Sequence, residues 1–97
     1  MKNLKDIRRI LAANRKELRE RYNVKSISIF GSYARGEQTE KSDLDVMVEL
    51  DKTIGLFQLM DLQDYIKKLV GLKVDIVPKE SLKPIIKKDI LKEAVSV

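Results

Sequence analysis

The stretch GSYARGEQTEKSDLDV, residues 31–46, decides how the rest of the chain is interpreted. It begins with Gly31 and Ser32, directly after residues 24–30, in which apolar Ile27 and Ile29 alternate with Ser26 and Ser28 as is typical of a β-strand. Glycine lets the backbone turn sharply and come close to a ligand. The free N–H groups where a helix begins, together with a serine hydroxyl, suit the binding of phosphate. The start of this stretch therefore predicts an anion-binding turn.

The same stretch ends with two aspartates, Asp43 and Asp45, at the start of a second predicted strand. The apolar positions of that strand alternate, and they are Leu44, Val46, Val48 and Leu50. Asp43 and Asp45 therefore fall on the opposite face. Two neighbouring carboxylates repel each other unless a cation lies between them. Hard oxygen ligands beside a phosphate-binding turn indicate magnesium that holds a nucleoside triphosphate.

The chain has 97 residues and contains neither cysteine nor histidine. A chain of this length predicts one domain over residues 1–97 with one core. The missing residue types exclude Ser-His-Asp and Cys-His catalysis, so a general base would be a carboxylate, a lysine or a tyrosine. No apolar run reaches membrane-spanning length, and the first residues lack the apolar segment of a signal peptide, so we expect a cytoplasmic protein that does not contact a membrane.

The net charge of +5 raises the possibility of nucleic-acid binding. The basic residues, however, are spread over predicted helices in which acids are interspersed, as on ordinary solvated faces. Aromatic residues are few, so no stacking platform for bases is evident. We therefore expect no direct contact with nucleic acid, although the basic faces could meet an acidic protein partner.

The remaining elements follow from periodicity and from start and stop signals. We expect a helix over residues 3–21 with Asn3 as its N-cap, a surface loop over 37–42, a helix from 55 or 56 to 70 that ends before Gly71, a strand over 72–77 stopped by Pro78, and a last helix over 81–95 with Ser81 as its N-cap and Pro84 in its first turn. The apolar residues of this last helix either cover the sheet or leave a patch for a partner or a second copy.

The strand-helix-strand unit over residues 44–77 predicts a right-handed crossover between two parallel strands. Parallel pairing would bring Asp75 onto the face that carries Asp43 and Asp45. The expected fold class is α+β, with a small mixed sheet of three or four strands packed with helices in the order α-β-α-β-α-β-α.

Three converging carboxylates and an anion-binding turn suit metal-assisted phosphoryl or nucleotidyl transfer. Asp43 and Asp45 would hold one or two Mg²⁺ ions, and Asp75 would add a ligand and accept the proton of the attacking hydroxyl. Ser32 and the amides after it would bind the outer phosphates, and Arg35 could neutralise their charge through its bidentate guanidinium. For Asp75, a structural ion pair with Lys73 is the alternative, and Ser32 could simply cap a helix.

Gly31-Ser32, ten intervening residues, Asp43-Leu44-Asp45 and the later Asp75 resemble the signature of the DNA polymerase beta-type nucleotidyltransferase superfamily. The whole stretch is similar to that of the minimal nucleotidyltransferases of bacteria and archaea, and the resemblance covers nearly the whole chain. It implies a polymerase beta-like fold in which the three aspartates bind magnesium and Gly31-Ser32 holds nucleotide phosphates. Arg35 and Gly36 also match the local pattern.

The resemblance further implies a partner, because small members of this family typically accompany a ribonuclease toxin of the HEPN class. The chain would then be a type VII-like antitoxin that transfers AMP from ATP to a tyrosine of the toxin. It would be a hetero-oligomer with that toxin, or a homo-oligomer. Two alternatives stay open: an antitoxin that neutralises its partner by binding alone, and an enzyme that transfers nucleotides to RNA or a small molecule.

Overall fold

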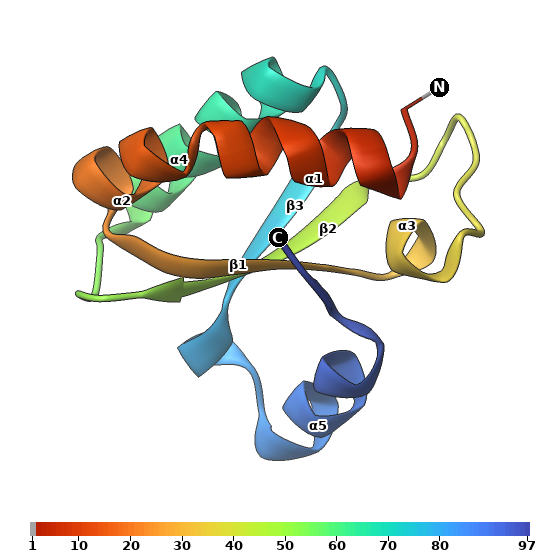
Figure 1. Cartoon of the computed structure of the whole chain (residues 1–97). Helices are drawn as coiled ribbons and strands as arrows, with labels where there is room; N and C mark the ends of the chain where they lie inside the picture. The colour runs from red at the N-terminus through yellow and green to blue at the C-terminus, as the bar shows by residue number, and fades with distance from the viewer. Residues whose placement is uncertain (1) are drawn as a thin grey trace.

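The computed structural model describes residues 2–97, in which helices cover both faces of one β-sheet (Figure 1). Along the chain the elements are α1 (Leu4–Ala13), α2 (Arg15–Tyr22), β1 (Val24–Phe30), α3 (Ser32–Arg35), β2 (Leu44–Leu50), α4 (Leu56–Val70), β3 (Val74–Pro78), the 3₁₀-helix η1 (Lys79–Ser81), α5 (Pro84–Glu93) and β4 (Val95–Ser96).

The sheet has the strand order β3-β2-β1-β4. Strand β1 pairs in antiparallel fashion with β2 on one side and with β4 on the other, whereas β2 and β3 are parallel. The predicted α+β class with a mixed sheet is confirmed, in its four-stranded form. The parallel pair joined by α4 is also as predicted, and it places the ends of β2 and β3 beside each other.

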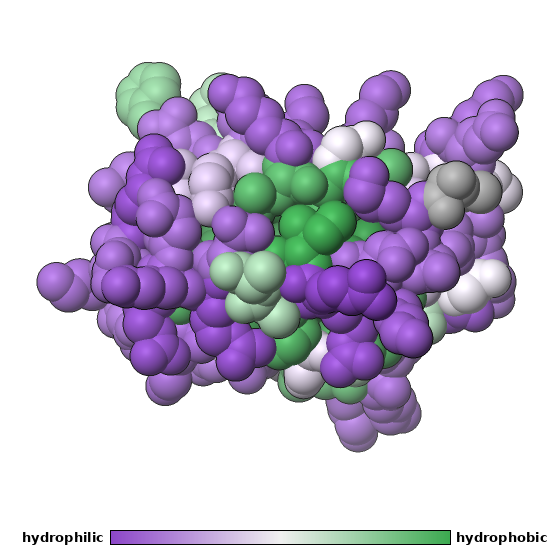
Figure 2. All heavy atoms as spheres, turned by 45° about the horizontal axis from the view of Figure 1, so that its top comes forward, coloured by the Kyte–Doolittle hydropathy of each residue, from purple (hydrophilic) through white to green (hydrophobic). Residues whose placement is uncertain are grey.

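One face of the sheet packs against α1, α2 and α4, and the core lies between these layers (Figure 1). Its fully buried side chains include Ile7 and Leu11 of α1, Ile29 of β1, Val46 and Val48 of β2, and Leu62 and Ile66 of α4. The helices present mostly polar residues to solvent, and Figure 2 shows hydrophobic residues gathered near the centre of the viewed face, with a further hydrophobic group at its upper left edge. This asymmetry matches the amphipathic pattern of the helices.

The predicted single helix over residues 3–21 is wrong, because the helix breaks at Asn14 into α1 and α2. The side-chain amide of Asn14 donates to the carbonyl of Ile10 at 2.8 Å. Asparagine competes in this way with the main chain for hydrogen bonds, which interrupts helices. The other end of α1 is as predicted, since the side chain of Asn3 accepts a hydrogen bond from the N–H of Asp6 at 2.9 Å.

The boundaries after Gly71 also differ from the prediction. Strand β3 spans residues 74–78 rather than 72–77, and Pro78 lies opposite Val48 within it. The last helix starts at Pro84 with Lys83 as its N-cap, and Ser81 ends a separate 3₁₀ turn. Proline disfavours the helical conformation for the residue before it, so the helix begins at Pro84 and not earlier. The predicted end of this helix at Val95 is instead the start of β4.

Helix α5 lies below the other face of the sheet, on the same side as the short η1 (Figure 1). None of its residues is buried, and Ile85, Ile86 and Leu91 are 79, 47 and 46% exposed. The apolar side chains of α5 therefore leave a surface patch as well as contributing Leu91 to the wall of a cavity. The other apolar residues of this segment, Leu82, Ile90 and Val95, are half-buried.

Candidate active site

The turn after β1 is built around Gly31, whose φ of +74° and ψ of −153° are accessible to glycine and strained for other residues. A side chain is excluded here for a second reason, because a Cβ on Gly31 would collide with Oδ2 of Asp45. The carboxylate of Asp45 thus packs directly against the Gly31 turn. Gly31 is also the N-cap of α3, so the alternative that Ser32 caps this helix is wrong, and Ser32 is its first residue.

The parallel pairing of β2 and β3 places Asp45 opposite Asp75. On its other side, Asp45 lies opposite Phe30, the last residue of β1 before the turn. Asp43 precedes β2 by one residue and is exposed, as is Asp75, whereas Asp45 is half-buried. The structure therefore brings the motif aspartates, the later aspartate and the glycine turn to one end of the sheet, as the sequence predicted.

The acidic side chains at this end interact electrostatically. Partial burial raises the pKa of the Asp45 carboxyl above its ordinary value, and the charges of Asp75 and then Asp43 raise it further. The guanidinium of Arg35 opposes this effect only in part. Asp45 is therefore a carboxylate whose charge is disfavoured in the absence of a cation.

Carboxylate oxygens are the donors that Mg²⁺ prefers, so the chemistry of this set fits the predicted ion. Within residues 2–97, however, no three acidic side chains are gathered closely enough to form a ready metal-binding group. The predicted convergence is seen in the strand register, which places Asp45 opposite Asp75, and in the effect of the charges of Asp75 and Asp43 on Asp45. It does not extend to a closed cluster of side chains in the described conformation.

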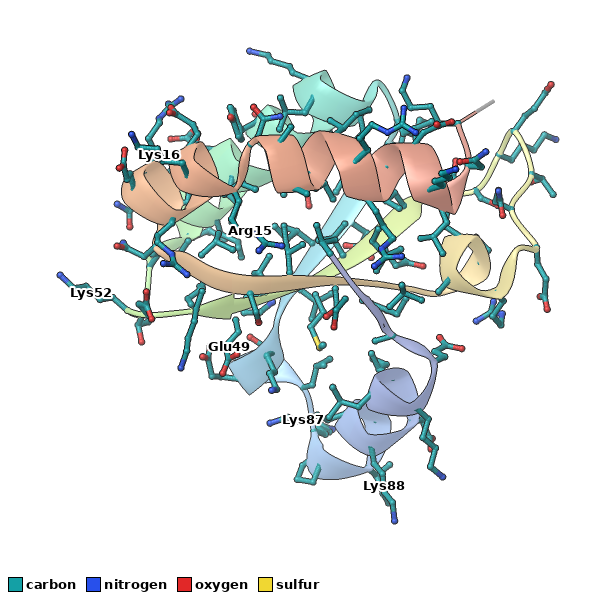
Figure 3. The ribbon with its side chains drawn as sticks, viewed as in Figure 1. Arg15, Lys16, Glu49, Lys52, Lys87 and Lys88 are labelled. Carbon is teal, nitrogen blue, oxygen red and sulfur yellow. The ribbon has the colours of Figure 1, made fainter. Side chains whose placement is uncertain are left out.

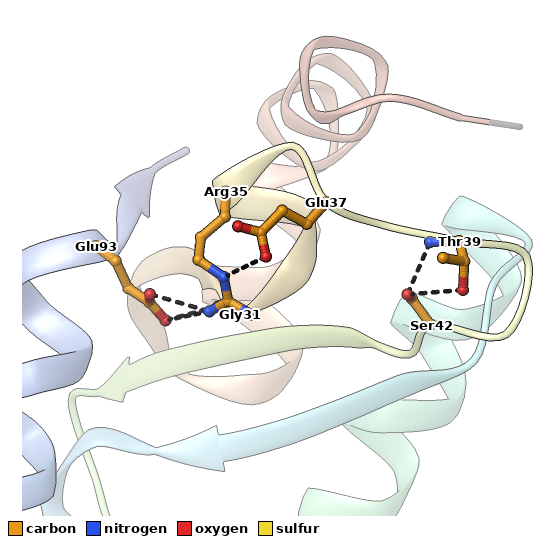
Figure 4. A network of polar contacts seen from close by, with 6 residues as sticks. All are labelled: Gly31, Arg35, Glu37, Thr39, Ser42 and Glu93. Carbon is orange, nitrogen blue, oxygen red and sulfur yellow. Dashed lines mark hydrogen bonds and ion pairs between the residues drawn. The ribbon is translucent and has the colours of Figure 1, made fainter.

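A second carboxylate source, Glu93 at the end of α5, reaches the same turn (Figure 4). Its Oε1 accepts a hydrogen bond from the N–H of Gly31 at 3.1 Å, and its two oxygens lie 3.3 and 3.1 Å from Nη1 of Arg35. Arg35 also donates through Nε to Glu37 at 3.3 Å. The bond from Gly31 and then that from Arg35 lower the pKa of Glu93, and the bonds to Glu93 and then Glu37 raise that of Arg35.

Glu93 is the site residue that sequence reasoning missed. It lies 62 positions after Gly31 in a helix whose other acid, Asp89, is an ordinary exposed residue. No local motif distinguishes the two acids. Only the pairing of β4 with β1, which holds Val95 opposite Ile29, brings the end of α5 to the turn.

The loop over residues 37–42, which precedes Asp43, is held by hydrogen bonds between Thr39 and Ser42. The N–H of Thr39 donates to Oγ of Ser42 at 2.9 Å (Figure 4). The N–H of Ser42 donates to the carbonyl of Thr39 at 3.0 Å. These bonds fix the approach of the chain to the aspartates. The predicted surface loop is confirmed, since residues 37–42 form no helix or strand and most of them are exposed.

A cavity of about 360 Å³ is lined by residues from both sides of the sheet, and Asp43, Asp45 and Asp75 are not among them. Its wall on the α5 side includes Ser28 and Met47, which pair with each other one row beyond the Phe30–Asp45 pair on the same face, and Leu91 of α5. It also reaches Glu49, on the α5 side of the sheet, and Arg15, on the α1 side (Figure 3). Two residues along a strand correspond to about 7 Å, so the cavity lies within reach of a ligand held at Asp45.

The sequence of this chain matches the nucleotidyltransferase domain family over residues 11–97. The chain belongs to this family. The match includes the turn at Gly31 and all three aspartates, and the family assignment makes the protein a nucleotidyltransferase. The resemblance inferred from the motif alone is thereby confirmed.

Curated relatives of the nucleotidyltransferase cover its whole length. It is 46% identical over 97 residues to the protein adenylyltransferase MntA of Thermococcus cleftensis, with 100% of this chain and 98% of that protein covered. It is 49% identical over 98 residues to MJ0128 of Methanocaldococcus jannaschii, provisionally named a protein adenylyltransferase, with both chains covered completely.

Solved structures share its fold. A protein thought to be a minimal nucleotidyltransferase superposes with a TM-score of 0.83 at 32% identity, over 99% of this chain and 97% of the other. The complex of a tri-AMPylated HEPN toxin with its MNT antitoxin from Shewanella oneidensis contains a similar chain, with a TM-score of 0.68 at 19% identity over 93% of this chain and 70% of that one. At that identity the second likeness shows the fold alone.

No helix in the described part of the nucleotidyltransferase is long and apolar enough to cross a membrane.

Proposed function

We propose that this nucleotidyltransferase is a magnesium-dependent protein adenylyltransferase that moves AMP from ATP to a tyrosine of a HEPN-type ribonuclease toxin and thereby acts as its antitoxin. The observation that carries the proposal is the pairing of Asp45 with Asp75 directly beside the Gly31 turn. Acidic groups on neighbouring strands next to the main-chain N–H groups of a helix start suit a nucleotide with its cation.

The relatives support the proposed acceptor class and partner. The relative from Thermococcus cleftensis is named a protein adenylyltransferase, and a toxin–antitoxin complex with a similar fold has been solved with the ATP analogue AMP-PNP. The Shewanella oneidensis complex contains a HEPN toxin that carries three AMP groups. The exposed apolar side chains of α5, with Leu56 and Phe57 of α4 at 70 and 81% exposure, offer surfaces that a protein partner could cover.

In the proposed reaction the tyrosine hydroxyl attacks the α-phosphorus of ATP, the bond from that phosphorus to the bridging oxygen of the β-phosphate breaks, and diphosphate leaves. Asp75 accepts the hydroxyl proton, because the chain has no histidine to do so. The N–H groups of the turn and the hydroxyl of Ser32 bind the outer phosphates, and Arg35 offsets their charge.

Asp43, Asp45 and Asp75 would hold the magnesium. When bound, the ion would offset the mutual repulsion of the carboxylates and the charge that develops on the leaving diphosphate. Partial burial, and then the charges of Asp75 and Asp43, raise the pKa of Asp45, and a divalent cation would relieve the part of this rise that comes from the charges.

The test is to incubate the protein with Mg²⁺, isotopically labelled ATP and the genomically adjacent toxin, and to weigh the toxin by mass spectrometry. A mass gain of whole AMP groups on a tyrosine is the expected result. It should be absent with the Asp43→Ala/Asp45→Ala variant and present with Asp51→Ala, which removes an exposed aspartate beyond the far end of β2.

A purely binding antitoxin is the second candidate, because Glu93 already engages Gly31 and Arg35 in the described conformation. A toxin that stays unmodified but is bound and silenced equally by the wild type and by Asp43→Ala/Asp45→Ala would favour this candidate and overturn the catalytic one. Transfer of the label to added RNA instead of the toxin would contradict the proposed acceptor.

A further inference from the structure

We infer that Glu93 occupies the phosphate-binding turn of the free protein and has to leave it when a nucleoside triphosphate binds. The inference rests on the proposed function, which assigns Gly31 and Arg35 to the phosphates. Both of these donors are engaged by the carboxylate of Glu93, through the N–H of Gly31 at 3.1 Å and through Nη1 of Arg35 at 3.3 and 3.1 Å (Figure 4).

The carboxylate of Glu93 and a phosphate would compete for the same positions. Each is an anion that accepts hydrogen bonds from an N–H group and a guanidinium. The N–H of Gly31 carries a single hydrogen, so a good bond to one acceptor excludes an equally good bond to the other. The two anions would also repel each other at close distance. The carboxylate of Asp45 is nearby as well, and the charge of Glu93 contributes to raising its pKa.

The contact is built so that it can open. Glu93 is at the last position of α5, a helix with no buried residue, so little apolar packing resists a movement of its last turn. The side chain of Glu93 is 32% exposed and that of Arg35 is 44% exposed. Just beyond Glu93, Val95 is fixed by its pairing with Ile29 of β1. Release therefore requires the side chain of Glu93 to rotate away from the turn, together with a movement of the last turn of α5. The pairing of β4 with β1 stays in place.

The consequence is that Glu93 sets the affinity for nucleotide. Part of the binding free energy of a triphosphate is spent on displacing the carboxylate, and the apparent affinity falls by that amount. A partner that draws α5 away from the turn would raise the affinity, so that the site opens best in the complex in which transfer takes place.

The experiment is isothermal titration calorimetry of the full chain with Mg²⁺ and AMP-PNP, comparing the wild type with Glu93→Gln and Glu93→Ala. Removing the charge should tighten binding by about twofold to fivefold, the range expected for a partly exposed ion pair that no longer competes. Asp89→Asn is the matched control, because it removes an equal charge from an exposed position on the same helix. It should change the affinity by less than about twofold, since its charge is screened by solvent.

Equal or weaker binding by Glu93→Gln than by the wild type would overturn the inference and assign Glu93 a supporting role in the turn. Circular dichroism identifies a variant that fails to fold, and the near-isosteric glutamine keeps the test usable if the alanine variant is lost. If the wild type and all variants bind AMP-PNP with the same affinity, the inference about Glu93 is wrong and the proposed nucleotide site is unaffected. Absence of binding by every form, the wild type included, overturns the proposed nucleotide site as well.

Discussion

Asp45 of β2 lies directly opposite Asp75 of β3, and its carboxylate packs against Gly31. The pairing depends on the parallel crossover through α4, which aligns the two strands from Leu44–Val74 onward. Like charges on neighbouring strands destabilise a sheet unless something offsets them. Partial burial of Asp45, and then the charges of Asp75 and Asp43, raise the pKa of its carboxyl. Asp45 and Asp75 therefore affect both the stability of the sheet and the proposed chemistry at the Gly31 turn.

Asp75→Asn should lower the rate of AMP transfer by about 10² to 10⁴-fold, the usual contribution of a group that accepts a proton in the transition state. The fold should be unaffected, because Asp75 is exposed and asparagine has nearly the same shape. Single-turnover transfer to the toxin measures the rate, and Asp61→Asn on the exposed face of α4 is the control. A full rate in Asp75→Asn would remove this residue from the reaction.

Magnesium should stabilise the free protein. A cation held between Asp43 and Asp45 binds the folded state only, so free Mg²⁺ at several times its dissociation constant should raise the Tm by at least about 4 °C. EDTA should reverse the shift, and Asp43→Asn/Asp45→Asn should abolish it. A shift of equal size in that variant would place the ion elsewhere on the protein.

Gly31→Ala and Gly36→Ala should separate backbone strain from steric collision. Both glycines have positive φ, +74° and +70°, but only at Gly31 does an added Cβ meet another atom, Oδ2 of Asp45. Gly36→Ala should cost about 1–2 kcal/mol from its left-handed conformation alone. Gly31→Ala should cost about 2–5 kcal/mol, since overpacking adds to the strain. Urea unfolding of the two variants measures the difference, and equal losses would show that Asp45 moves aside freely.

Local signals in the sequence were sufficient for much of this structure. The strands over residues 24–30 and 44–50 and the helix ending before Gly71 have the predicted bounds, because alternation, amphipathic spacing and a cap glycine all indicate the same boundaries. The positions of Asp45 and Asp75 followed from the rule that a strand-helix-strand crossover makes its strands parallel.

What the sequence did not indicate depends on contacts between distant parts of the chain. Nothing near Asn14 marks it as a break, since its effect comes from a side-chain bond to Ile10 that a helical pattern does not reveal. The two-residue β4 is too short to give a periodic signal, and it exists because β1 offers it an edge. The position of Glu93 depends on β4, so the carboxylate at the turn could not be found from its own neighbourhood.

The stability contributed by Glu93 should depend on pH in a defined direction. Its bonds from Gly31 and Arg35 lower its pKa below the ordinary value of 4.5. A carboxyl with a lowered folded-state pKa stabilises the protein fully above its unfolded pKa, and this contribution is lost as the pH falls through the folded value. At pH 7, Glu93→Gln should therefore have a Tm about 1–4 °C below that of the wild type, as expected for a partly exposed ion pair.

Scanning calorimetry of the two forms between pH 7 and pH 2.5 should show the two Tm values converging only below about pH 4.5, where the carboxyl of Glu93 becomes protonated. Asp89→Asn should show no comparable convergence, because Asp89 has no such partners among the described contacts. A Tm difference that is unchanged at pH 2.5 would mean that Glu93 acts through packing instead of charge. The loss of stability at pH 7 and the gain of nucleotide affinity in Glu93→Gln have one cause, since both arise from removing the same anion from the turn at Gly31.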